Sequence, residues 1–180
     1  MGASSEPLYF GFENMPVEVI VTRKIPKIET AGLRIQETEP GRELTVSLWV
    51  AWELVDAGLA RLADEGVSDE EWTQIHYRER FQPIGQPSPI PDDFYLKAYM
   101  TFKKSRRTSE SDSSSLGSLD RMRGRFRDIL ESRIGKIIRL ASAEAAVESR
   151  GLQKEESRLY NDLYSLVSSW RKEMRELGGS

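Results

Sequence analysis

The clearest pattern of apolar and polar positions lies in the last third of the chain. Apolar side chains recur at steps of three and four from residue 119 to residue 145, and again from residue 154 to residue 176. This spacing places them on one face of a helix, whereas a half-buried strand would alternate apolar and polar positions. The pattern therefore predicts two long amphipathic helices, separated by a break at Gly151.

The apolar stripes of these two helices supply the candidate contacts with a partner chain. Helices with broad stripes bury them against each other or against another subunit, and periodicity does not distinguish the two outcomes. The candidate interface residues are Phe126, Ile129, Leu130, Ile134, Ile137, Ile138, Leu159, Leu163, Leu166, Trp170 and Met174.

Three shorter helices are predicted in the middle of the chain. Helical spacing begins at Ser47 and continues to residues 64–66, where a helix end is expected. Ser68 with Glu71 three residues later is typical of a capping box, and Pro91 is typical of a first helical residue in a helix that reaches Lys104. The residues expected to be buried are Trp49, Trp52, Phe94, Tyr95, Ala98, Tyr99 and Phe102, and the middle helix should run through Trp72, Ile75 and Tyr77.

The first fifty residues instead favour short strands. LYFGFE at residues 8–13 and VEVIVT at residues 17–22 are rich in β-branched and aromatic side chains. A third strand is expected near Leu33–Gln36, with a turn at Pro40–Gly41 and a return strand at Glu43–Val46. So small a β unit is expected to lean on another part of the chain or on a neighbour.

These elements together predict an α+β fold that is predominantly α. A small β-rich domain at residues 1–46 is followed by a bundle-like domain of about five helices at residues 47–180. A serine-rich polar segment at residues 105–118 has little apolar area to bury, so a mobile loop is expected there.

The charge distribution adds a basic region to this outline. The net charge is only -3, but residues 103–140 hold 11 Lys and Arg against 5 Asp and Glu, while residues 1–102 hold 9 against 17. The acidic and basic parts either meet different partners or attract each other within the fold. No apolar run approaches the roughly 20 residues that span a bilayer, and the absence of cysteine favours an intracellular setting.

The candidate nucleic-acid contacts lie at the start of the basic helix, at Arg121, Arg123, Arg125 and Arg127. Alternate positions on a helix point about 200 degrees apart, so these arginines surround the helix and do not line one groove. A solvated, ion-paired flank is therefore favoured over a DNA contact, which stays as the alternative.

Residues suited to catalysis are sparse and scattered. His76 is the only histidine, and no serine or cysteine motif accompanies it. The acidic pairs Glu70–Glu71 and Asp92–Asp93 lie at predicted helix starts, where the helix dipole explains them. No phosphate-binding glycine loop or metal-ligand spacing occurs. We therefore expect no enzymatic activity, no catalytic residue, no cofactor and no metal.

Two short motifs resemble the GINS subunits of the replicative helicase complex. One is the helix start at Ile90–Tyr95, and the other is the Asp-Ile-x-x-x-Arg-x-x-Lys-Ile pattern at Asp128–Ile137. The family-like positions in the second are Asp128, Ile129, Arg133, Lys136 and Ile137. The β unit ahead of the helices resembles the class in which the β-rich B domain precedes the helical A domain.

The resemblance implies a non-catalytic scaffold of archaeal type. Two copies would pair with two copies of a companion subunit of A-then-B order, in the cytoplasm and near the nucleoid. The tetramer would link the MCM helicase to a RecJ-like protein and help to activate the helicase, with at most weak DNA contact. The rival hypotheses are an independent nucleic-acid-binding adaptor that uses the basic 103–139 region, and an enzyme built from dispersed acids.

Overall fold

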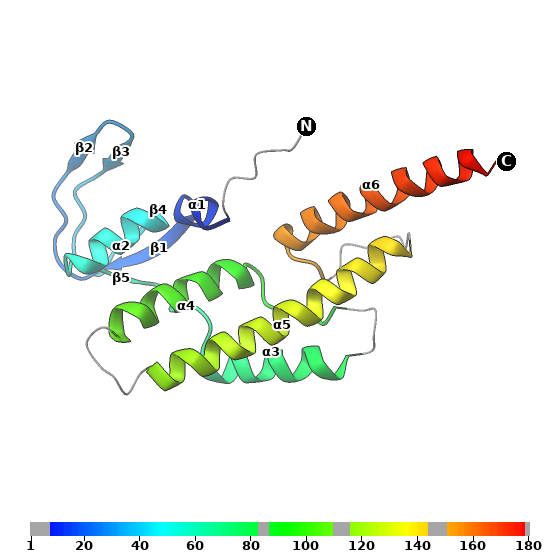
Figure 1. Cartoon of the computed structure of the whole chain (residues 1–180). Helices are drawn as coiled ribbons and strands as arrows, with labels where there is room; N and C mark the ends of the chain where they lie inside the picture. The colour runs from blue at the N-terminus through cyan, green and yellow to red at the C-terminus, as the bar shows by residue number, and fades with distance from the viewer. Residues whose placement is uncertain (1–7, 83–86, 110–115, 144–150, 179–180) are drawn as a thin grey trace. The chain divides into compact units, whose positions relative to one another are not determined.

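The computed structural model describes residues 8–82, 87–109, 116–143 and 151–178. The chain divides into two compact units, Met1–Gly66 and Val67–Ser180, and each is considered by itself. The elements of the first unit are α1 (Leu8–Glu13), β1 (Pro16–Val21), β2 (Ile28–Thr30), β3 (Leu33–Ile35), β4 (Glu43–Ser47), α2 (Leu48–Asp56) and β5 (Ala60–Leu62). The elements of the second unit are α3 (Asp69–Phe81), α4 (Phe94–Ser109), α5 (Leu116–Ser142) and α6 (Lys154–Leu177) (Figure 1).

The first unit is built around an antiparallel sheet with strand order β4-β1-β5. Val19 and Val21 of the central strand are buried and alternate with more exposed residues, as expected for a strand with one face on a core. Helix α2 supplies the covering residues Val50, Ala51 and Leu54. The unit therefore encloses its own small core.

The strand pairing differs from the expected one. Strand β4 pairs with β1, and β3 pairs with β2 in a separate hairpin whose turn contains Gly32 at φ 91°. Residues 8–13 form helix α1, and the prediction of a strand there was wrong. The aromatic residues of this segment fit either element, so composition alone did not decide between them.

Helix α2 ends sooner than the apolar spacing predicted. Gly58 adopts a left-handed φ of 68°, its N–H donates to Val55, and the N–H of Leu59 donates to Leu54. These two bonds form a Schellman motif, which satisfies the last carbonyls of the helix. The chain then enters β5, so the first unit extends to Gly66 and past the expected boundary at residues 46–47.

The tryptophans of α2 do not share one environment. Trp52 is buried as expected, with 3% of its surface exposed. Trp49 is 44% exposed, and its prediction as a core residue was wrong. Positions three apart on a helix diverge by about 60 degrees, which is enough to carry one ring out of a narrow contact face.

Helix α3 begins with the predicted capping box. The Ser68 hydroxyl accepts from the Glu71 N–H, and the Glu71 carboxylate accepts from the Ser68 N–H at 2.8 Å. Trp72 and Ile75 are buried, whereas Tyr77 is 61% exposed. The third buried position of this face is a charged residue, Glu79, which lies one helical turn beyond Ile75.

Helix α4 starts later and ends later than predicted. Asp93 has a φ of 55°, and its carbonyl accepts the first helical bond, from Lys97, so the helix begins at Phe94 and not at Pro91. At the other end, residues 105–109 belong to α4 and residues 116–118 belong to α5. The remainder of the expected loop, residues 110–115, lies outside the described residues.

The core of the second unit is aromatic. Trp72 of α3 contacts Phe94 and Phe102 of α4 and Phe126 of α5, with ring centroids 5.5 to 6.0 Å apart. Such edge-on and tilted pairs contribute beyond the area that they bury. They join α3, α4 and α5 into one core.

The observed architecture confirms the α+β class with helices predominant. Among the described helices, none is both long enough and apolar enough to cross a membrane.

Candidate functional site

Two cationic residues of α5 lie inside the second unit. Arg133 is 0% exposed and Lys136 is 6% exposed. They belong to the basic 103–140 region, yet they are buried, because they lie on the same face of the helix as the buried Ile129 and Ile137. Buried cations require anionic partners and hydrogen-bond acceptors, and the fold supplies both.

Arg133 uses its whole guanidinium group. Its Nε and Nη2 donate to the two carboxylate oxygens of Glu156, a bidentate pair. Its Nη1 donates to the Ser88 carbonyl at 2.7 Å and to Glu79 at 3.2 Å. Its Nη2 also donates to the Gly151 carbonyl at 2.8 Å. A guanidinium has five N–H donors, and each has an acceptor here.

Glu79 of α3 receives donors from three directions. Its Oε1 accepts from Lys136 at 2.6 Å and from Ser132 at 3.2 Å, and its Oε2 accepts from the N–H of Ser88 at 3.1 Å and from Arg133. Burial by itself would raise the pKa of this carboxyl. The hydrogen bonds from Lys136 and Ser88 and the charge of Arg133 outweigh burial, and the pKa lies below its ordinary value.

Glu156 is the acidic partner from α6. Its Oε2 also accepts from the N–H of Gln153, which precedes the helix, so the same carboxylate closes the capping box of α6. Its Oε1 accepts from the Tyr95 hydroxyl at 2.6 Å. Burial, together with this carboxylate, raises the pKa of Tyr95. For Arg133, burial lowers the pKa, but the bonds to Glu156 and the Glu79 charge leave it raised.

This Arg133 cluster comprises Glu79, Ser88, Tyr95, Ser132, Arg133, Lys136 and Glu156. Its two cations and two carboxylates balance in charge, and they come from three helices. The charged groups are almost fully removed from solvent. The arrangement is therefore suited to fixing α3, α4 and α6 onto α5.

The Arg133 cluster contains two residues of the Asp128–Ile137 motif, but the acidic members of the cluster were not predicted from the sequence. Arg133 and Lys136 are motif residues. Asp128, another motif residue, is exposed, and its Oδ2 lies 3.3 Å from Nε2 of the partly buried His76. Glu79 and Glu156 were not singled out. The available signal was their position, because Glu79 follows Trp72 and Ile75 on one helical face and Glu156 completes a capping box.

Helix α6 carries an apolar face that its own unit leaves largely uncovered. Leu166 is 68% exposed, Trp170 is 60% exposed and Leu177 is 78% exposed. Together with Leu159, at 37%, these residues define the open face of α6. They lie within a narrow strip of the helix surface, because their spacings of seven, four and seven residues return to nearly the same direction.

Contacts with α5 occupy a neighbouring strip of α6. Leu163 and Val167 are only partly exposed. Arg171 donates to the Ser142 carbonyl at 2.6 Å, while Glu156 bonds to Arg133 near the start of α6. These two anchors show that α6 runs beside α5 in the same direction.

The structure separates the candidate interface residues into three groups. Ile129 and Ile137 are buried inside the unit, and Phe126 packs against its aromatic core. The residues of intermediate exposure are Leu130, Ile134 and Leu163. The exposed residues are Ile138, Leu159, Leu166, Trp170 and Met174. The third group is the one free to meet a partner directly.

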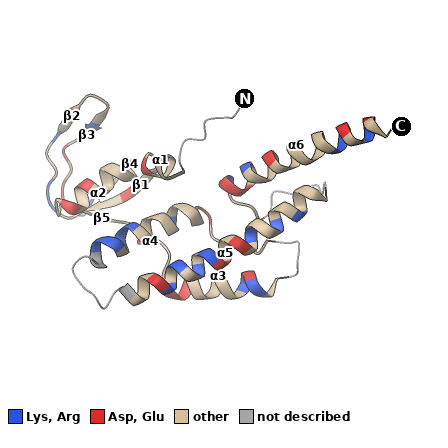
Figure 2. Cartoon of the chain, in the orientation of Figure 1, with Lys and Arg blue, Asp and Glu red and all other residues tan. Residues whose placement is uncertain are grey.

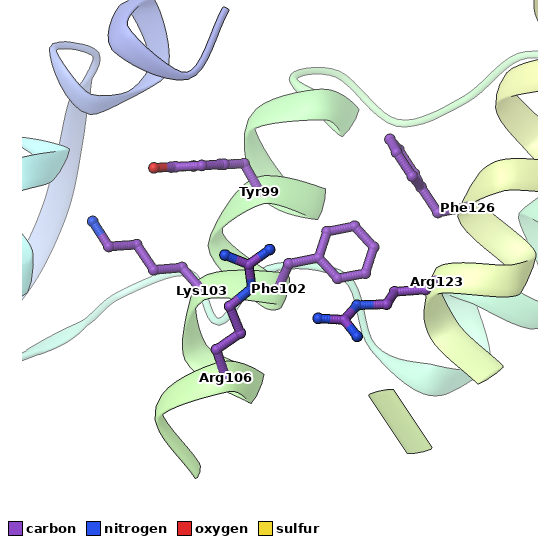
Figure 3. A pocket seen from close by; sticks show the side chains of 6 residues that line it. All are labelled: Tyr99, Phe102, Lys103, Arg106, Arg123 and Phe126. Atoms are coloured by element: carbon purple, nitrogen blue, oxygen red, sulfur yellow. The ribbon is translucent and has the colours of Figure 1, made fainter. Parts of the chain in front are cut away.

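A basic pocket of about 380 Å³ lies between α4 and α5. It is lined by Tyr99, Phe102, Lys103, Arg106, Arg123 and Phe126 (Figure 3). Lys and Arg residues are frequent at the C-terminal end of α4 and along the first half of α5 (Figure 2). Of the four arginines proposed for nucleic acid, only Arg123 lines the pocket, while Arg121 and Arg127 are exposed elsewhere and Arg125 is partly covered.

The fold and these surfaces define a class of protein. In this helical bundle, buried charged side chains hold the last helix, and the apolar face of that helix is exposed. Such an arrangement is typical of a subunit of a larger assembly. The family model described as "GINS complex protein helical bundle domain" (Sld5) matches residues 61–175. The chain therefore belongs to the GINS family, a family of non-catalytic scaffold proteins associated with DNA replication.

One curated protein is also similar to part of the chain. It is the snake venom metalloproteinase-disintegrin-like mocarhagin of Naja mossambica, 27% identical over 131 residues. The match covers 71% of this chain but only 20% of that protein, so the chain spans about a fifth of its length. With a single histidine, this sequence cannot contain the HExxH zinc motif of metalloproteases. The similarity therefore carries no activity over to this chain.

Proposed function

We propose that the protein is a scaffold subunit that helps to link and activate the replicative MCM helicase at the fork. Membership of the GINS family supports complex formation with other GINS subunits. In this proposal two copies pair with two copies of an A-then-B companion, in an archaeal-type complex that also contacts a RecJ-like protein. The first unit, ahead of the helical bundle, would be the B domain, and the complex would work in the cytoplasm near the nucleoid.

The observation that carries the proposal is the open face of α6. A large apolar strip exposed to water is unfavourable by about 25 cal/mol for each Å² of apolar surface, so covering it provides a driving force for association. The Arg133 cluster holds the start of α6 in place, so this face is presented by a positioned helix and less ordering is needed on binding. Exposed Ile138 and Met174 would extend the contact.

The test is co-expression of the full chain with the A-then-B GINS subunit of its own genome, followed by size-exclusion chromatography with light scattering. A stable complex with two copies of each chain is the expected result. A monomer that does not bind the companion would contradict the proposal. A complex of another stoichiometry would retain the scaffold function and correct the 2:2 assignment.

A second candidate function is the nucleic-acid-binding adaptor that uses the basic 103–139 region. The frequent Lys and Arg residues of α4 and α5 (Figure 2), three of which line the basic pocket, favour it. Its signature would be DNA affinity that falls steeply with salt and that weakens when Arg121, Arg123, Arg125 and Arg127 are replaced.

A further inference from the structure

The basic pocket combines two kinds of lining, one cationic and one aromatic. Lys103, Arg106 and Arg123 supply three positive charges, and no carboxylate is among the described lining residues. Tyr99, Phe102 and Phe126 supply an aromatic wall. The side chains of Arg106 and Arg123 come from different helices and reach toward the same space in front of Phe102 (Figure 3). A ligand for this site therefore needs negative charge beside an apolar group.

The two arginines keep their capacity to bind an anion. Arg106 is exposed. Arg123 forms an ion pair with Asp120 of the same helix, at 3.4 Å, and the two side chains are 48% and 76% exposed. An exposed pair of this kind contributes little, so a better-placed carboxylate can replace Asp120 at small cost.

The aromatic wall is poorly arranged for stacking nucleic-acid bases. Phe102 and Phe126 meet nearly edge to face, at 74° with centroids 5.3 Å apart, and both belong to the margin of the aromatic core. The Lys103 ammonium lies 5.9 Å from the centre of the Tyr99 ring. Base stacking requires open ring faces in succession along a basic track. Here the wall bounds one pocket of about 380 Å³, which is large enough for an apolar side chain together with the carboxylates beside it.

The arrangement of charge around the pocket also disfavours a long polyanion. The neighbouring arginines of α5 point around the helix, and Asp120, Asp128 and Glu131 are exposed among them. A phosphate backbone that follows α5 would meet these carboxylates, whereas a short segment bound at the pocket would avoid most of them.

We propose that the basic pocket docks an acidic peptide segment of a partner protein, with carboxylates on Arg106 and Arg123 and one aromatic or aliphatic side chain against Tyr99, Phe102 and Phe126. This docking site adds a partner contact to the scaffold function. It does not depend on the subunit stoichiometry, because the pocket lies within a single chain.

The test uses fluorescence anisotropy with the full chain and a short labelled peptide of Asp and Glu that has one central Phe. Saturable binding is expected, and R106Q/R123Q should weaken it by about tenfold or more. R121Q/R127Q is the matched control, because it removes the same charge from exposed positions outside the pocket and should retain binding. A peptide with Ser in place of Phe should bind more weakly than the parent peptide.

Three results would overturn the proposal. Absence of saturable binding would remove the site. Equal losses in the two double variants would show a general charge effect. Tighter binding of a labelled oligothymidylate, lost in R106Q/R123Q alone, would make the pocket a nucleic-acid site. Because the lone chain is used, these outcomes are independent of the co-expression experiment.

Discussion

At the scale of single residues, the second unit depends on a charge-balanced cluster buried within an otherwise apolar core. Arg133 has no exposed surface, and its partners Glu79 and Glu156 come from helices that precede and follow α5 in the chain. Removing one member of such a cluster leaves the remaining charges uncompensated in a protein interior that solvates them poorly. The resulting loss of stability is therefore larger than the stabilisation that one ion pair contributes.

The substitution Arg133→Met tests this dependence. It leaves Glu79 and Glu156 buried without their shared cation, and should lower the free energy of unfolding by about 3–5 kcal/mol. Arg127→Met, an exposed position on the same helix, should change it by less than about 0.5 kcal/mol. Urea unfolding followed by circular dichroism measures both. Equal effects of the two substitutions would mean that the cluster adds no special stability.

The lowered pKa of Glu79 predicts a stability that declines in acid. The unfolded carboxyl has its ordinary value of 4.5 and the folded one lies below it, so the unfolded chain binds more protons between these values. The stabilisation is complete above pH 4.5 and is lost as the pH falls through the folded-state pKa. Glu79→Gln should reduce the slope of unfolding free energy against pH in this window, by up to about one proton. An unchanged slope would contradict the assignment.

At the scale of elements, the helix ends are set by local hydrogen bonds. The capping box of Ser68 and Glu71 begins α3, and the Schellman motif at Gly58 ends α2. Both devices satisfy backbone groups that would otherwise lack partners at a helix terminus. Each of these two motifs therefore sets where its helix, and with it the apolar stripe of that helix, begins or ends.

Ser68→Ala should destabilise the second unit by about 1 kcal/mol, because the Glu71 N–H loses its acceptor. The matched control is Thr73→Ala on the same helix. The Thr73 hydroxyl donates to the Asp69 carbonyl of its own helix, and its loss should cost less than about 0.5 kcal/mol. Thermal unfolding of both variants measures the difference. A control as damaging as Ser68→Ala would show that the cap is not the cause.

Sequence reasoning succeeded for elements whose signals are local. The capping box, the central strand and the two long helices were all predicted, because each rests on neighbouring residues or a single period. It failed at α2, where Leu59 and Leu62 continued the helical spacing beyond the left-handed Gly58. It also failed for Glu79 and Arg133, because the burial of a charge depends on partners that are distant in sequence.

At the scale of the whole molecule, the open face of α6 is the surface most suited to assembly. Leu166→Ser with Trp170→Ser should abolish or strongly weaken the complex with the companion subunit, while leaving the helical signal of the lone chain unchanged. Arg158→Ser with Lys172→Ser, on the polar face of α6, should preserve the complex. Light scattering of the co-expressed chains distinguishes these results. Intact assembly by the first pair would relocate the interface.

The Arg133 cluster also restricts which substitutions this sequence can accept during evolution. Each of its four charged members contacts an oppositely charged member, so a neutral replacement at one position exposes the others to the cost of burial without a counter-charge. Tolerated replacements are then paired ones, such as an apolar residue at 133 together with a neutral residue at 156, which keeps the Lys136–Glu79 pair intact. Across related sequences, these positions should therefore vary jointly, although they are far apart along the chain.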